Sequence, residues 1–209
     1  MCIEIHNTRQ KVTETTQQPL TRSQRKAERL ERQRQIEQRY RKARQRNVMA
    51  QPGPNTFAFV LDNLKAGYNV PKIFRSTQAF GGAEVHLVNI GIFDPAPAKG
   101  AFRKVPARFH DSVTAAIEEL QNKGYTLYAM TANAQHHLPE TELAAKSAFI
   151  IGHEETGLSF EPADFPGVQT LAIPLFGEME SLNASVAASI AMYEFTRQHG
   201  NKPEPQQPG

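Results

Sequence analysis

The sequence predicts an α/β protein in which a parallel sheet is flanked by helices. Between residues 56 and 198, short apolar runs alternate with segments of helical periodicity. Nearly continuous apolar runs are typical of strands buried on both faces, as in a parallel sheet covered by helices. Residues 54–200 are long enough to bury the core of one such domain. Sites are then expected at the carboxyl ends of the strands.

The expected strands are five apolar runs, at residues 56–61, 84–89, 126–131, 148–152 and 170–174. The expected helices lie at residues 70–80, 111–123 and 181–198. Asn69 fits the cap of the first helix, with Pro71 in its first turn, and Asp111 or Ser112 fits the cap of the second, which stops at Gly124. The connection at residues 90–110 has a length that usually indicates a functional or a disordered segment.

A basic helical extension is predicted at residues 22–50. Of its residues, 22–46 carry eleven basic and three acidic side chains, whereas residues 47–209 carry eleven basic and sixteen acidic ones. A basic appendage on an acidic body indicates binding to a polyanion. Ile36, Tyr40 and Ala43 form a thin apolar stripe on this helix. We expect the flanking residues 1–21 and 201–209 to be flexible because they are polar or rich in proline.

Several classes of protein are disfavoured by composition. Cys2 is the one cysteine of the 209 residues, so a disulfide scaffold is excluded and a reducing compartment fits. Apolar runs stay well short of the roughly 20 residues of a membrane span, and a signal-peptide core does not follow Met1. The sequence therefore predicts a cytoplasmic protein that does not contact a membrane.

Three polar segments follow predicted strands, and each has an ordinary structural interpretation. Residues 62–76 fit a capped helix with a surface arginine. Residues 152–158 fit a glycine-rich turn, although glycine also permits close approach of the backbone to a ligand. Residues 173–189 run through a glycine-containing loop into a helix rich in Ala and Ser, whose cap fits Ser181 or Asn183.

Taken together, the three segments resemble the motifs of the SpoU/TrmH class of RNA ribose methyltransferases, in the SPOUT superfamily. The resemblance covers roughly residues 56–198. The matching residues are Asn69, Arg75-Ser76 and Ala79-Phe80-Gly81 in the first motif, Gly152, Glu154, Gly157 and Leu158 in the second, and Ile173-Pro174 and Ser181-Leu182-Asn183-Ala184-Ser185-Val186-Ala187 in the third. Pro71 and Ala184 differ from the residues that are usual at these positions of the family motifs, but neither is one of the polar motif positions.

The resemblance implies a C-terminal trefoil knot, a homodimer formed through the knot region, and S-adenosylmethionine as the cofactor. It implies methyl transfer to a ribose 2′-hydroxyl of tRNA or rRNA, activated by Arg75. The residues expected to position Arg75 and the ribose are Asn69, Glu154, Ser181 and Asn183. The residues expected to hold the cofactor are Thr131, Gly152, Ile173 and Leu182. The reaction needs no metal, and His136-His137 lacks the spacing of a zinc site.

The side chains expected to contact RNA lie in the basic extension and in the long connection: Arg25, Lys26, Arg29, Arg103, Lys104 and Arg108. Phosphate contacts position an RNA without reading its sequence, so they do not name the substrate. Two alternatives stay open. The protein could bind RNA with the same fold and catalyse nothing, or it could be an α/β module that binds a small molecule or an acidic protein.

Overall fold

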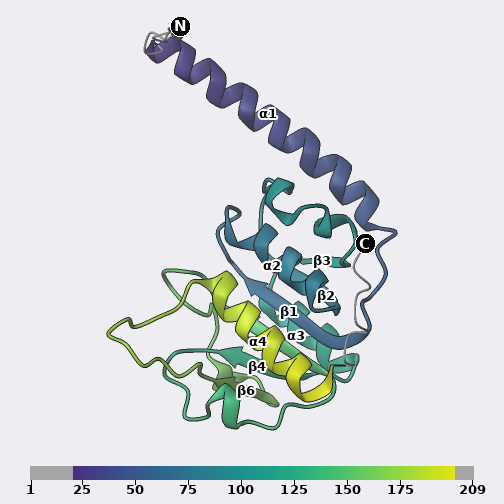
Figure 1. Ribbon diagram of the computed structural model, residues 1–209, viewed down its shortest axis with the longest axis vertical. Helices are drawn as coiled ribbons and strands as arrows, with labels where there is room; N and C mark the ends of the chain where they lie inside the picture. The colour runs from purple at the N-terminus through teal and green to yellow at the C-terminus, as the bar shows by residue number, and fades with distance from the viewer. Residues whose placement is uncertain (1–20, 201–209) are drawn as a thin grey trace, which may run out of the picture. The chain divides into compact units, whose positions relative to one another are not determined.

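A parallel sheet forms the centre of the part of the chain from residue 55 to residue 200 (Figure 1). The computed structural model describes residues 21–200, and in that part of the chain the sheet has six strands in the order β3-β2-β1-β5-β4-β6. The strands are β1 Asn55–Asp62, β2 Gly82–Val88, β3 Ala107–His110, β4 Thr126–Met130, β5 Ser147–Ile151 and β6 Val168–Leu171. All paired neighbours run parallel, so the predicted parallel sheet of an α/β protein is confirmed.

Helices cover both faces of the sheet, as Figure 1 shows. Helices α2 (Asn69–Ala79) and α4 (Ala184–His199) pack on the face that carries Phe57, Phe59 and Phe149. Helix α3 (Val113–Asn122) packs on the opposite face. The alternation of side chains along each strand supplies apolar groups to both cores, which is why the runs read as continuously apolar.

The helix boundaries follow local capping. Ser112 caps α3 by accepting a hydrogen bond from the backbone N–H of Ala115, as one of the two expected caps. Helix α4 starts at Ala184, three residues later than predicted, because Asn183 caps it. The expected cap of α2 is wrong. The N-cap residue is Tyr68, and Asn69 is already helical with its side chain turned to another partner.

The connection after β2 is ordered and packed, so of the two expected possibilities, a functional or a disordered segment, the disordered one is wrong. It contains the 3-10 helices η1 (Ala96–Ala98) and η2 (Ala101–Arg103) and then β3, an edge strand that the sequence analysis missed. Phe93 and Phe102 of this connection are each 1 % exposed. Strand β3 escapes recognition because it contains no apolar run, and the alternation of its four residues, Ala-Arg-Phe-His, is too short to stand out from a loop.

The predicted basic helix is present as α1 (Arg22–Asn47). The chain divides into two compact units, residues 1–34 and residues 35–209, so the second unit begins within α1 and before the Pro-Gly-Pro break at 52–54. In the second unit Tyr40 is buried, stacked on Phe102 with ring centroids 5.7 Å apart and edge-on to Phe93 at 5.1 Å. The apolar stripe of the helix is therefore a docking face for the connection after β2.

Asn47 fixes the end of α1 to this connection. Its buried side-chain amide donates to the carbonyl oxygens of Phe102 (2.6 Å) and Val105 (2.7 Å), and its Oδ1 accepts from the backbone N–H of Ala107 (3.0 Å). Asn47→Ala would leave three buried backbone groups without partners. We expect the free energy of unfolding to fall by about 2–3 kcal/mol, measured by urea denaturation. The neighbouring exposed Gln45→Ala is the control and should change it by less than about 0.5 kcal/mol.

Residues 1–20 and 201–209 are outside the described residues. The two segments that we expected to be flexible, 1–21 and 201–209, therefore lie outside the described part of the chain, except for Thr21. Within residues 21–200, none of the helices combines the length and apolar character needed to cross a membrane.

Candidate active site

Two of the expected site residues meet at the carboxyl edge of the sheet. Asn69 begins α2, which follows β1, and Glu154 lies in the loop that follows β5, the neighbour of β1. The Asn69 amide donates to Glu154 Oε1 (2.8 Å), and the backbone N–H of Lys65 donates to Glu154 Oε2 (3.1 Å). Both carboxylate oxygens of Glu154 are thus held, and the loops after β1 and β5 are joined.

The other polar atom of the Asn69 amide is left free. Asn69 is 7 % exposed, and among the described residues its Oδ1 is a buried acceptor without a hydrogen-bond partner. A buried polar atom without a partner costs roughly 1–3 kcal/mol. Buried polar atoms of this kind are common where a ligand or an ordered water supplies the missing hydrogen bond. Asn69 therefore has one atom engaged by the protein and one available to a bound group.

The loop after β5 requires glycine at its first position. A Cβ on Gly152 would lie 2.4 Å from the carbonyl carbon of Gly157 and 2.5 Å from the backbone nitrogen of Leu158. His153 and Gly157 exchange two backbone hydrogen bonds, of 2.8 and 2.9 Å, which fold the loop back on itself. Gly157 has φ +72°, a conformation that favours glycine. The two glycines of the second motif therefore build a tight hairpin.

Asp62 is a positioning residue that the sequence analysis did not single out. It is fully buried at the end of β1, where its carboxylate accepts from the backbone N–H (2.7 Å) and the hydroxyl (2.7 Å) of Ser159. These bonds fasten the far end of the 152–159 loop to β1. The available signal was a carboxylate directly after a buried strand, which needs a partner wherever it is buried.

The pKa of Glu154 reflects its contacts. Burial alone would raise the pKa of this carboxyl, but the hydrogen bonds from Asn69 and from the Lys65 amide outweigh it and lower the pKa below its ordinary value. A lowered pKa means that these contacts stabilise the fold above the pKa of the unfolded chain, and that this contribution is lost as the pH falls through the folded-state pKa.

Asn69→Ala should therefore raise the pKa of Glu154, because it removes the side-chain donor and leaves only the Lys65 amide. The measurement is a pH titration of the Glu154 carboxyl carbon by NMR. Tyr68→Phe is the control, because Tyr68 is exposed and makes no contact with Glu154 in the described structure. An unchanged pKa of Glu154 in Asn69→Ala would show that the hydrogen bond between Asn69 and Glu154 does not stabilise the carboxylate in solution.

Arg75 lies farther along α2. It is exposed, and six residues of helix separate it from Asn69 by about 9 Å along the axis. It lines an open depression of about 510 Å³ between α2 and α4, together with Lys72, Ser76, Ser185, Val186, Ser189, Ile190 and Tyr193. Ser189 donates to Ser76 (2.9 Å) across the two helices. The small residues of α4 therefore pack closely on α2.

The remaining expected residues are distributed around the same edge. Thr131 follows β4, Gly152 follows β5 and Ile173 follows β6 by two residues, and these strands are neighbours in the sheet. Leu182 and Ser181 are exposed just before α4. Asn183 acts as the helix cap, because its Oδ1 accepts from the backbone N–H (3.0 Å) and hydroxyl (2.7 Å) of Ser185. Among the described residues the structure thus joins Asn69 to Glu154 by a hydrogen bond, whereas Ser181 and Asn183 form no hydrogen bond with either.

The expected RNA-contacting side chains are exposed. Arg25, Lys26 and Arg29 lie on α1 in the first unit, and Arg103 and Lys104 lie at η2 in the second. Arg108 on β3 is partly engaged, because its Nε donates to Glu84 Oε2 at 3.2 Å. All six residues are therefore exposed, and Arg108 shares its charge with an ion pair of the protein.

Comparison with known proteins identifies relatives of this arrangement. The chain is 29 % identical over 144 residues to a tRNA (guanosine(18)-2′-O)-methyltransferase of Thermus thermophilus, covering 66 % of this chain and 73 % of that protein. It is 29 % identical over 151 residues to the 23S rRNA (guanosine-2′-O-)-methyltransferase RlmB of Xylella fastidiosa, covering 70 % and 60 %. An uncharacterized tRNA/rRNA methyltransferase of Synechocystis is 32 % identical over 146 residues, which cover 68 % of this chain but only 38 % of that protein.

Solved structures show the same fold. The TrmH/SpoU tRNA modifying enzyme of A. aeolicus superposes with a TM-score of 0.62 at 23 % identity, covering 78 % of this chain and 83 % of that one. The SpoU methyltransferase AviRb from Streptomyces viridochromogenes, in complex with AdoMet, superposes with a TM-score of 0.61 at 22 % identity, covering 70 % and 59 %.

The parallel sheet, with its loops at the carboxyl edge, is the fold that this chain shares with those SpoU structures. Residues 56–193 match the SpoU rRNA Methylase family, and the chain belongs to that family. The matched residues begin in β1 and end in α4, so they include every one of the three motif segments.

Proposed function

We propose that the protein transfers a methyl group from S-adenosylmethionine to a ribose 2′-hydroxyl of tRNA or rRNA. The observation that carries the proposal is the family match over residues 56–193, which contains the joined pair Asn69 and Glu154. The relatives named above act on guanosine ribose in tRNA or in 23S rRNA. Their two substrate classes differ, so the choice between tRNA and rRNA rests on experiment.

The cofactor would be held by the loops that follow three neighbouring strands. Thr131, Gly152 and Ile173 would surround it, and Leu182 would close the side next to α4. The tight hairpin at Gly152 and the free Oδ1 of Asn69 fit a group bound largely through backbone and amide contacts. When bound, S-adenosylmethionine supplies an electrophilic methyl group on a sulfonium. We place the protein in the cytoplasm, where RNA and this cofactor meet.

The chain's own residues would position and activate the ribose. A guanidinium is a donor with five N–H groups and no acceptor, so Arg75 would polarise the 2′-hydroxyl and balance developing charge. Holding the hydroxyl in line with the methyl group would supply much of the rate. Glu154, held by Asn69 and Lys65, would orient the substrate side of the loop, and Ser181 and Asn183 would order the start of α4 beside it.

Two further features of the class are part of the proposal. Exposed Val186 and Tyr193 flank the depression that contains Arg75, and such apolar groups fit a homodimer interface on α2 and α4. The segment before β5 lies beside the chain after β6, since Leu138 donates to Ala172 and Ala172 donates to His136. This parallel pairing is compatible with the trefoil knot expected for the C-terminal part.

The activity test uses the full chain with radiolabelled S-adenosylmethionine and total RNA from cells that lack the gene. We expect label to enter one RNA size class, and ribose-methylation mapping of cells with and without the gene should reveal the same site. Cofactor binding without methyl transfer to any RNA would instead support a catalytically inactive RNA-binding protein of the same fold.

The basic arm is tested by its salt dependence. Each basic side chain that neutralises an RNA phosphate releases a counterion, and each released counterion steepens the slope of log affinity against log salt concentration. A chain lacking residues 1–34 should therefore bind RNA more weakly and show a shallower slope. The deletion ends at residue 34 because Tyr40 and Asn47 belong to the packed second unit. An unchanged slope would favour the alternative in which the helix docks on an acidic protein.

A further inference from the structure

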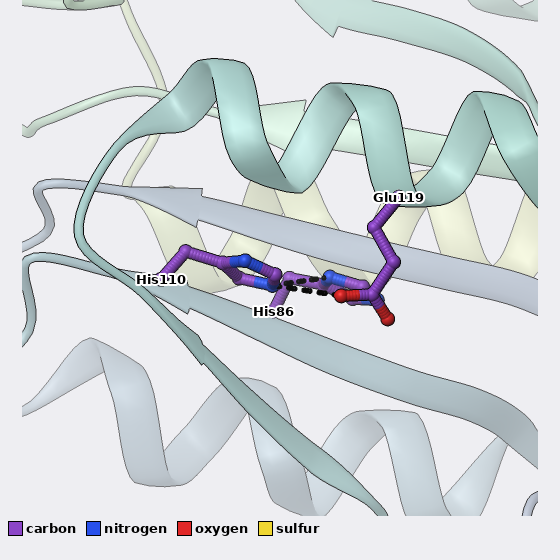
Figure 2. Close-up of side chains that lie close together, drawn as sticks. All are labelled: His86, His110 and Glu119. Atoms are coloured by element: carbon purple, nitrogen blue, oxygen red, sulfur yellow. Dashed lines mark hydrogen bonds and ion pairs between the residues drawn. The ribbon is translucent and has the colours of Figure 1, made fainter.

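A cluster of titratable side chains lies at the sheet edge opposite to the cofactor loops. His86 comes from β2, His110 from the end of β3 and Glu119 from α3, and Figure 2 shows the three side chains converging between the edge strands and the helix. Strands β2 and β3 lie at one end of the sheet order, whereas β4 and β6 lie at the other. The cluster is therefore separate from the proposed methyl-transfer site.

The geometry of the three donors is close to that of a metal site. Nδ1 of His86 and Nε2 of His110 share a hydrogen bond of 2.8 Å, which an ion would replace, and that Nε2 lies 3.8 Å from Oε2 of Glu119. One donor atom from each residue lies within 4.8 Å of the other two. Ligands at about 2.0–2.1 Å from a tetrahedral Zn²⁺ are about 3.3 Å apart. Shifts of about half an ångström in the two measured distances would give that spacing.

Glu84 and Lys123 contact the three donor residues in the way that hydrogen-bonding partners of metal ligands commonly do. Nε2 of His86 faces Glu84 Oε1 at 3.3 Å, and Glu84 also pairs with Lys123 at 2.7 Å. Lys123 holds the other oxygen of Glu119, Oε1, at 2.7 Å and leaves Oε2 turned to His110. In metal sites a ligating histidine directs its second nitrogen at a carboxylate, and a ligating carboxylate is itself hydrogen-bonded.

The cluster is buried yet incompletely satisfied. His86 is fully buried, and within residues 21–200 its Nε2 lies near Glu84 without forming a hydrogen bond of good geometry. The His110 side chain is 8 % exposed and that of Glu119 is 37 % exposed, so an ion has a route from solvent past Glu119. A slight rotation of His86 around a bound ion would let Nε2–H donate to Glu84.

We propose that His86, His110 and Glu119 bind one Zn²⁺ ion, with a water molecule as the fourth ligand. Two imidazoles and a carboxylate suit zinc, whereas a hard cation such as Mg²⁺ prefers oxygen ligands alone. The ion would fasten the four-residue edge strand β3 and helix α3 to β2. Its role would be structural, because the proposed cofactor loops follow β5, β4 and β6, which lie beyond β1 in the sheet order.

The test uses the full chain, purified without a histidine tag and stripped of metal. Co²⁺ replaces Zn²⁺ as a spectroscopic probe, and we expect one equivalent to give the visible absorption of a four-coordinate ion, displaced by Zn²⁺. Zn²⁺ should also raise the melting temperature. His110→Gln should abolish the absorption, and Glu119→Gln should weaken binding at least about tenfold.

Control variants separate this site from surface binding and from misfolding. His136→Gln removes an exposed histidine elsewhere and should leave the Co²⁺ absorption and its stoichiometry unchanged. Far-UV circular dichroism should show that both ligand variants keep the native secondary structure. The proposal is overturned if the native chain shows neither the absorption nor the rise in melting temperature, or if both survive in His110→Gln.

Discussion

Arg75→Ala should abolish methyl transfer while leaving cofactor binding largely intact. Arg75 is exposed on α2 and lines the depression between α2 and α4, whereas the proposed cofactor loops lie at the carboxyl ends of β4, β5 and β6. Loss of one charge-stabilising donor at a reacting centre typically lowers kcat by about 10²–10³-fold. The measurements are single-turnover methyl transfer to the mapped RNA and calorimetric titration with S-adenosylmethionine.

Two companion variants make this result interpretable. Gln78→Ala changes another exposed position on the same helix and should leave both readouts unchanged. Arg75→Lys keeps the charge but loses the forked donor geometry, so we expect only partial recovery of rate. Full activity in Arg75→Ala would remove Arg75 from the proposed mechanism, and a loss of cofactor binding would reassign it to the cofactor site.

Gly152→Ala should damage both stability and cofactor binding. The added methyl group would meet backbone atoms of Gly157 and Leu158 at 2.4–2.5 Å, and backbone cannot turn aside as a flexible side chain can. Forcing a methyl group into such a packed position typically costs about 1–3 kcal/mol. We expect a loss of that size in the free energy of unfolding, and a weaker affinity for S-adenosylmethionine because the hairpin is displaced.

Gly91→Ala is the matched control for that substitution. It adds the same methyl group at an exposed glycine where nothing lies within 4 Å and φ is not positive. Stability and cofactor affinity should both be retained. If Gly152→Ala behaved like Gly91→Ala, the hairpin would be more plastic than the structure indicates, and its proposed role in holding the cofactor would lose its physical basis.

The elements that the sequence predicted well are those dominated by one local signal. β1, β2, β4 and β5 are buried on both faces, so their apolar runs mark them within a residue or two. α3 is bounded by Ser112 and Gly124, whose capping chemistry is local. β3 carries no such signal. It pairs with β2 because the packed connection before it places it beside that strand. Asn47 holds this connection by hydrogen bonds to residues that lie 55–60 positions later in the chain.

The candidate site divides in the same way. The three motif segments were recognisable because they follow predicted strands and together resemble the motifs of the family in order and spacing. The role of each side chain depended on contacts made across the fold. Asn69 was expected to cap its own helix but instead binds Glu154, 85 positions away in the chain. Asp62 was not predicted as a positioning residue, because its partner Ser159 lies far away in the sequence. The two residues meet only once the 152–159 loop has folded back.

The anchoring of α1 also bears on how its basic segment becomes helical. Starting a helix is unfavourable because several residues must be ordered before the first hydrogen bond forms, whereas extending an existing helix costs little. Tyr40, Ala43 and Asn47 fix the last turns of α1 as part of the second unit. The folded body can therefore act as the nucleus from which helix propagates backwards through the arginine-rich turns, so that the helical order of the arm is coupled to the folding of the domain that carries the chemistry.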